Sequence, residues 1–135
     1  MATSYLLDTN ILSAALCGKP HALLNRLAGI ARERLHLSAL VLAELATGAE
    51  LGERRASTLG AVRDLTAGME LLPFGADDAM AYSRVRAALE RKGQMIGQLD
   101  CLIAAQALAR DLVVVTDNLR EFKRVPGLKC ENWMR

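Results

Sequence analysis

The residues of this chain that could do chemistry are mainly carboxylates, and three of them stand at unusual places in their local patterns. Asp8 lies where the short apolar run SYLL gives way to a helix-like pattern. Glu44 lies inside the apolar stretch ALVLAELA, and Asp100 lies in the first turn of the helical stretch LDCLIAAQAL. Carboxylate oxygens are preferred ligands of Mg²⁺ and Mn²⁺. If the fold brings the three together, they predict a site for a hard divalent cation.

Each carboxylate also has a purely structural interpretation. Asp8 could cap the helix that follows it, and Asp100 could be stabilised by the dipole at a helix N-terminus. Glu44 favours a ligand more strongly, because a Glu among apolar residues is rarely buried unless it is paired or bound to a metal. A solvated Glu44 on a narrow polar stripe is the alternative. The local patterns leave both interpretations open for all three residues.

Other kinds of catalytic site have little support. His21 and His36 have no partner at ligand spacing, and the cysteines at 17, 101 and 130 form no C-x-x-C pair, so a zinc site is not predicted. The sequence contains no Ser-His-Asp or Cys-His arrangement and no glycine-rich phosphate loop. The acidic residues remain the best candidates.

Short β-rich runs alternate with longer helical patterns along the chain, which predicts one domain over residues 1–135. We expect strands at 4–8, 34–38, 69–74 and 112–116, and helices at 10–17, 21–32, 39–51, 54–68, 77–92 and 99–111. The strands are continuous apolar runs without alternation, which is typical of a parallel sheet covered on both faces. The predicted fold class is α/β, with a central parallel sheet of four to five strands.

The candidate residues fall where predicted strands end. In an open parallel sheet, all the carboxyl ends lie along one edge, and ligands bind there. Asp8 ends the first strand, and the sequence TDN at 116–118 follows the strand LVVV. We therefore expect these residues to meet at that edge.

Composition limits the class of protein. With 52% hydrophobic and 24% charged residues, neither disorder nor a coiled coil is predicted, and no apolar run reaches the roughly 20 residues of a membrane span. The start MATSYLLD lacks the features of a secretory signal, so a cytoplasmic location is expected. The net charge is only +2, but basic residues gather at 84–92 and 119–135. This pattern is compatible with a phosphate-rich partner or with an ordinary solvated helix face.

Four motifs carry a resemblance to a known family. They are D-T-N after the first apolar strand, E-L-x-x-G in LSALVLAELATGAE, D-x-x-I-A-A in DCLIAAQA, and V-V-T-x-N-x-x-E-F near the end. In this order and spacing the chain resembles PIN-domain proteins, specifically VapC-type ribonuclease toxins of bacterial toxin–antitoxin systems. The resemblance covers essentially the whole sequence.

The resemblance implies a Mg²⁺-dependent endoribonuclease, with Mn²⁺ as a substitute ion, that inhibits translation and growth. Asp8, Glu44 and Asp100 match the acidic residues that bind the ion in the family. The fourth acidic position of the family holds Asn118 here, and Asp117 is its neighbour. Which of these two completes the site is left open.

The resemblance also implies roles for polar and basic residues. Thr116, Asn10 and Ser38 match residues that orient the carboxylates or the metal-bound water. Asn10 and Ser38 are also expected to bind the substrate. The candidates for binding substrate phosphates are all basic: Arg84, Arg86, Arg91, Lys92, Arg120, Lys123 and Arg124. Among them Arg86 matches an arginine of the family.

The expected partners follow from the same resemblance: an RNA substrate, a second copy in a homodimer, and a VapB-type antitoxin. The antitoxin would place an apolar helix in the groove between the early helices and a basic residue in the acidic pocket. Operator DNA would be bound only through the complex, and no membrane contact is expected. Two other classes compete with this interpretation: a non-catalytic PIN-fold module that binds RNA or protein, and a receiver-like signalling domain.

Overall fold

The structure, a computed structural model, describes residues 2–135. Its five strands form one parallel sheet in the order β3-β2-β1-β4-β5. The strands are β1 (Tyr5–Leu7), β2 (Leu35–Ser38), β3 (Glu70–Leu72), β4 (Val113–Val115) and β5 (Cys130–Glu131). The α-helices within the described residues are α1 (Thr9–Leu16), α2 (His21–Ala28), α3 (Ala39–Leu51), α4 (Arg55–Thr66), α5 (Ala76–Arg91), α6 (Gln98–Arg110) and α7 (Leu119–Phe122). A short 3-10 helix, η1 (Arg32–Arg34), precedes β2.

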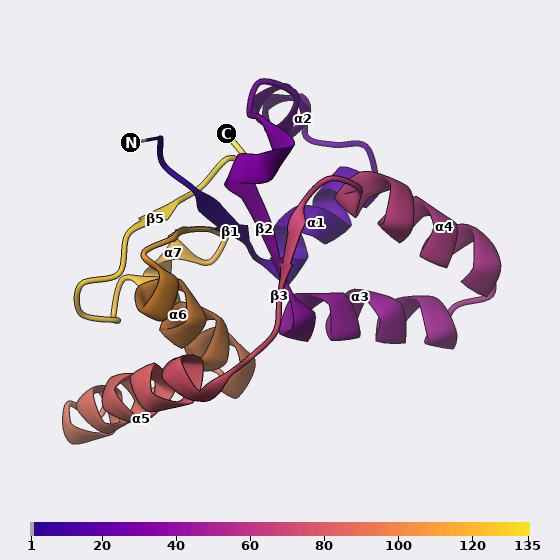
Figure 1. The fold of residues 1–135 in the computed structure, drawn as a ribbon. Helices are drawn as coiled ribbons and strands as arrows, with labels where there is room; N and C mark the ends of the chain where they lie inside the picture. Colours follow the sequence, from indigo (N-terminus) through magenta and orange to yellow (C-terminus); the bar gives the residue numbers. More distant parts are fainter. Residues whose placement is uncertain (1) are drawn as a thin grey trace.

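Helices cover both sides of the sheet. Helices α5 and α6 pack on each other on one side, and α1, α3 and α4 lie on the other (Figure 1). The predicted α/β class with a parallel sheet is thereby confirmed. None of the helices in residues 2–135 is both long enough and apolar enough to cross a bilayer.

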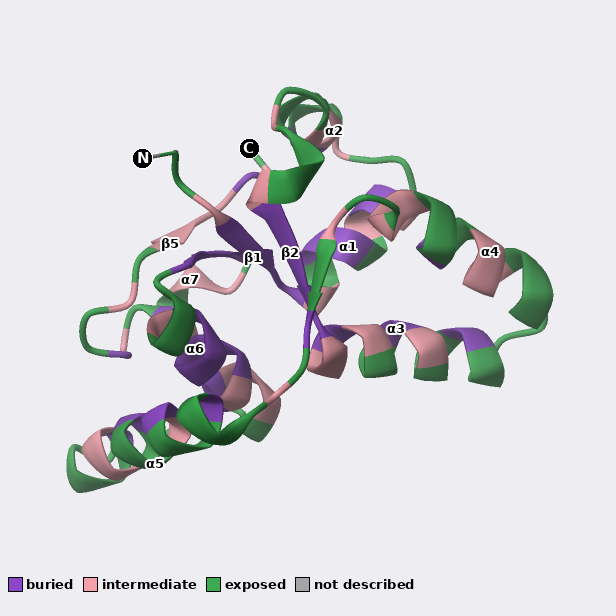
Figure 2. Ribbon diagram, viewed as in Figure 1, coloured by how far each residue is buried: buried purple, intermediate pink, exposed green. Residues whose placement is uncertain are grey.

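The burial of each strand explains its place in the sheet. Every residue of β1, β2 and β4 is buried, which suits central strands covered on both faces (Figure 2). In β3, Glu70 and Leu71 are exposed and only Leu72 is buried, as expected of an edge strand. The uninterrupted apolar runs of the sequence therefore correspond to the middle of the sheet.

The C-terminal region contains two elements that the sequence patterns did not predict. Helix α7 is four residues long and β5 only two, so neither shows a hydrophobic period. Strand β5 pairs with β4, and Trp133 behind it is buried with its ring centroid 4.8 Å from that of Tyr5. The C-terminal tail thus supplies the edge strand next to β4. Helix α7 follows the end of β4 in the chain.

Candidate metal and catalytic site

The register of the central strands brings Asp8 and Thr116 together. Leu7 of β1 pairs with Val115 of β4, and the Asp8 N–H donates to the Val115 carbonyl at 2.9 Å. The residues that follow the two strands are therefore neighbours at the carboxyl edge of the sheet. The Thr116 hydroxyl donates to Asp8 Oδ2 at 2.8 Å, and both residues are buried.

Asp8 combines the two interpretations that the sequence left open. Its Oδ1 accepts the Thr9 N–H at 2.8 Å and caps α1, while its Oδ2 faces Thr116. Thr116 Oγ1 also accepts the Asn118 N–H at 2.9 Å, so its own proton is directed to Asp8. Burial raises the pKa of Asp8, and the hydrogen bonds from Thr116 and Thr9 oppose that rise. The carboxylate is held in one orientation at a desolvated position.

Asp100 lies in the first turn of α6, close to the end of β4. Asn118 Nδ2 donates to Asp100 Oδ2 at 3.3 Å and to Glu121 Oε2 at 2.8 Å, so one amide bridges two carboxyl groups. Desolvation, the hydrogen bond with Glu121 and the negative charge of Asp8 raise the pKa of Asp100 to about 7. Hydrogen bonds from Asp100 and Asn118 lower the pKa of Glu121. Of these two carboxyl groups, Asp100 keeps its proton more readily than Glu121 does.

The structure distinguishes Asn118 from Asp117. Asn118 is half-buried beside Asp100, whereas Asp117 is exposed and its Oδ1 accepts from Asn132 Nδ2 at 3.0 Å. Asn118 presents its NH₂ group to the carboxylates.

Glu121 is a site residue for which the sequence reasoning assigned no role. It was visible as the E of V-V-T-x-N-x-x-E-F. A position three residues after Asn118 lies on the same face of a helix, but the sequence patterns predicted no helix there.

Glu44 differs most from the expectation. Its side chain is exposed on α3, whose buried positions are Val41, Leu45 and Ala49, so the argument for a buried glutamate was wrong. Glu44 is solvated, as the alternative had it, but on a broad exposed face and not on a narrow polar stripe. Glu44 does not contribute to the pKa shift of Asp8 or Asp100.

The two polar candidates at the N-termini of helices α1 and α3 have different surroundings. Ser38 is buried at the end of β2, and its Oγ accepts the Leu40 N–H at 3.1 Å, which caps α3. Asn10 is exposed in the first turn of α1, next to Asp8. Ser38 therefore has a structural task, whereas Asn10 has a side chain available to a ligand.

The arrangement fits a hard cation in its chemistry. Within residues 2–135, no three His, Cys, Asp or Glu side chains already stand as a complete metal cage. The donors that do gather, Asp8, Asp100 and Glu121, are all carboxylates, and desolvation together with the neighbouring Glu121 and Asp8 raises the pKa of Asp100. Mg²⁺ typically takes one or two protein carboxylates and keeps several waters, so Asp8 and Asp100 are ligands of the kind it uses.

Of the basic candidates, Arg124 lies near the acidic groups, and Arg86 lies near Cys101, the residue after Asp100. Burial raises the pKa of the Cys101 thiol and the charge of Arg86 lowers it, which places Arg86 close to the residue that follows Asp100. Arg124 acts in the same way on the pKa of Glu121. Arg86 is held on the exposed face of α5 by a 3.0 Å ion pair with Glu90. Exposed Arg120 lies on α7, one residue before Glu121.

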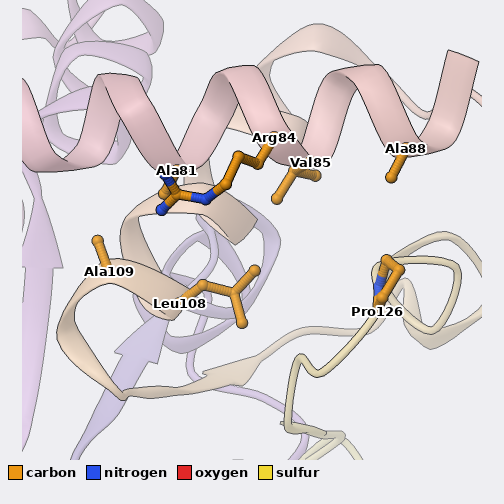
Figure 3. Close-up of a pocket in the computed structure, with 7 residues that line it drawn as sticks. All are labelled: Ala81, Arg84, Val85, Ala88, Leu108, Ala109 and Pro126. Atoms are coloured by element: carbon orange, nitrogen blue, oxygen red, sulfur yellow. The ribbon is translucent and has the colours of Figure 1, made fainter.

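Arg84 lies elsewhere. It lines a hollow of about 260 Å³ between α5 and α6, together with Leu108, Ala109 and Pro126 (Figure 3). Asp100 and Leu108 are eight residues apart on α6, which is about 12 Å along the helix axis. The structure therefore places Arg84 with an apolar hollow and not with the acidic groups. Arg91, Lys92 and Lys123 are exposed.

We predict that Glu121→Gln and Asn118→Ala raise the Mg²⁺ concentration needed for half-maximal RNA cleavage by about 10- to 100-fold, as loss of a ligand or its orienting partner does. Asp117→Ala should change it far less, because Asp117 faces Asn132. The measurement is a Mg²⁺ titration of initial cleavage rates. A larger effect from Asp117→Ala than from either other variant would move the site by one residue.

Comparison with known proteins shows what this chain is similar to. A family model described as PIN domain matches residues 5–128. Ribonuclease VapC2 of Rickettsia felis is 36% identical over 96% of this chain and 97% of its own length. The tRNA(fMet)-specific endonuclease VapC of Salmonella typhimurium is also 36% identical, over 96% and 97% of the two chains.

A solved structure agrees with the sequence comparison. The crystal structure of VapBC2 from Rickettsia felis, bound to a DNA fragment from its promoter, contains a chain that superposes with a TM-score of 0.90 at 34% identity. The match covers 97% of this chain and 99% of the other. The similarity therefore extends over nearly the whole chain.

Proposed function

Because the chain belongs to the PIN domain family, we propose that it is the ribonuclease toxin of a VapBC-type toxin–antitoxin module. Its reaction is the hydrolysis of RNA phosphodiesters, which stops translation and growth until the antitoxin neutralises it. The observation that carries this proposal is the cluster of Asp8, Asp100 and Glu121 at the carboxyl edge of the sheet. Relatives of similar length that are named ribonucleases support it.

The proposed cofactor is Mg²⁺, which Mn²⁺ would replace, held by Asp8 and Asp100 with Glu121 beside them; Glu44 would take part only by turning its exposed side chain toward them. Such an ion supplies positive charge for the phosphate oxygens and lowers the pKa of a water nucleophile. Thr116 fixes the direction of Asp8 through its hydroxyl. Asn118 bridges Asp100 and Glu121 through its NH₂ group.

Arginines near the cluster would bind the RNA backbone. Arg86 and Arg124 lie close enough to Cys101 and Glu121 to affect their pKa values, and Arg120 is exposed on α7. Guanidinium groups bind phosphate oxygens through two parallel hydrogen bonds, so they orient the phosphodiester as well as attract it. In this proposal the arginines position the substrate while the carboxylates supply the metal site.

The proposed partner is a VapB-type antitoxin, as in the complex from Rickettsia felis. A hollow of about 510 Å³ between α2 and α4, lined by apolar residues including Leu24, Leu27 and Leu65, suits an apolar helix of that partner. A basic antitoxin residue that enters the acidic cluster would pair with the carboxylates and compete with the metal. The toxin would act as a homodimer, and operator DNA would be bound only through the complex.

The test is cleavage of total bacterial RNA and of tRNA(fMet) by purified protein, with Mg²⁺ and with EDTA. We expect discrete RNA ends that require the metal, growth arrest on expression, and rescue by co-expression of the neighbouring small gene. Binding of RNA without any metal-dependent ends would favour the non-catalytic binding module instead.

A further inference from the structure

The loop between α5 and α6 exposes a methionine close to the acidic cluster. Met95 is 38% exposed, while the next residue, Ile96, is buried in the core. The Gln94 N–H donates to the Leu89 carbonyl at 2.9 Å, which fixes the start of the loop on the end of α5. Met95 is therefore partly exposed to solvent on a segment that is anchored on both sides.

Two contacts tie this loop to the site. Arg124 Nη1 donates to the Met95 carbonyl at 3.0 Å, and the charge of Arg124 also acts on Glu121. The backbone of Gly97 hydrogen-bonds to Glu121, and a Cβ placed on Gly97 would lie 3.7 Å from Asp100 Oδ2. Met95 is thus two residues from a glycine that touches both carboxyl groups.

We propose that Met95 and Arg124 form a subsite for the nucleotide next to the scissile phosphate, with the base lying against Met95 and its phosphate near Arg124. This inference rests on the proposed ribonuclease function. A methionine thioether is polarisable and makes favourable contacts with aromatic rings, so it accepts any base without hydrogen-bond readout.

The anchoring of the loop is what makes Met95 useful in this way. Because the backbone of the loop is already held before binding, only the Met95 side chain has to lose freedom when the base packs on it. Met80 provides the contrast: it is 60% exposed, but it lies on α5 beside Ala81, which lines the hollow shared with the far end of α6. Both methionines are exposed, so exposure alone does not distinguish them. What distinguishes Met95 is that its loop lies beside Asp100 and Glu121.

The experiment uses the RNA ends mapped in tRNA(fMet) or total RNA. Three short single-stranded RNAs that span the mapped site are compared. One has all its native bases, one has an abasic nucleotide directly before the cleaved bond, and one has an abasic nucleotide directly after it. We expect Met95→Ala to lower kcat/KM about three- to tenfold on native RNA, and to cause no further loss on RNA lacking the contacted base. Met95→Leu should keep most of the activity, and Met80→Ala should match the wild type.

Three results would overturn the proposal. Unchanged kcat/KM for Met95→Ala on native RNA would remove the contact, and equal losses on native and abasic RNAs on both sides would show an indirect effect. In either case metal-dependent cleavage by the wild type would leave the ribonuclease function standing. If the wild type cleaves no RNA at any metal concentration, both proposals fail.

Discussion

Asp8→Asn is expected to reduce RNA cleavage by about 10²- to 10³-fold, as loss of one preorganised electrostatic group in an active site does. The substitution removes a charge from the proposed metal site but keeps the size of the side chain. An amide oxygen still accepts the Thr9 N–H, so α1 keeps its cap. Cleavage of the mapped RNA at saturating Mg²⁺ measures the loss, and growth on expression in a bacterial host gives a second readout.

The same substitution should not weaken the metal-free fold, which separates a lost site from a lost structure. Burial raises the pKa of Asp8, so the charged form is disfavoured there, and its charge also raises the pKa of Asp100. A neutral amide relieves both effects, so the melting temperature in EDTA should be unchanged or higher. Asp64→Asn, on the exposed face of α4, is the matched control and should keep full activity. Wild-type cleavage by Asp8→Asn would refute the assignment of Asp8.

The sequence predicts most of the sheet edge because the local rules and the tertiary fold agree there. Asp8 and Thr116 each follow an apolar strand, and parallel neighbours place such residues side by side. The structure confirms this meeting with the hydrogen bond between them. The helix at 39–51 was also predicted with the bounds it has, since Ser38 provides a cap at its start.

Other features depend on contacts that no local pattern reports. Glu44 looked buried because alanines and leucines surround it in sequence, yet α3 buries only a narrow face that includes Val41 and Leu45. Alanine is tolerated on both the buried and the exposed face of a helix, so the alanines of α3 do not indicate which face is buried. Glu121 belongs to the site only because the four-residue α7 turns it back toward Asn118. Such a short helix has no period to read.

The pKa of Asp100, about 7, predicts how pH controls metal binding. A Mg²⁺ ion and a proton compete for the same carboxylate, so the apparent affinity should fall about tenfold for each pH unit below 7 and level off above it. An ordinary aspartate, with a pKa near 4, would show no such dependence above pH 5. The Mg²⁺-induced rise in melting temperature, measured from pH 5.5 to 8.5, gives the curve.

The metal-free protein should show the opposite trend. Asp100 binds its proton more tightly in the folded chain than in the unfolded chain, so the free energy of unfolding in EDTA falls as pH rises from about 4 to about 7 and then stays level. Asp100→Asn should remove this part of the pH dependence and also abolish the Mg²⁺ effect, whereas Asp64→Asn should change neither. Glu121→Gln should shift the inflection to lower pH, because a neutral neighbour no longer favours the protonated form of Asp100. An inflection near pH 4 in the wild type would mean that neither burial nor the neighbouring carboxylates raise the pKa of Asp100, and it would contradict the proposed metal site.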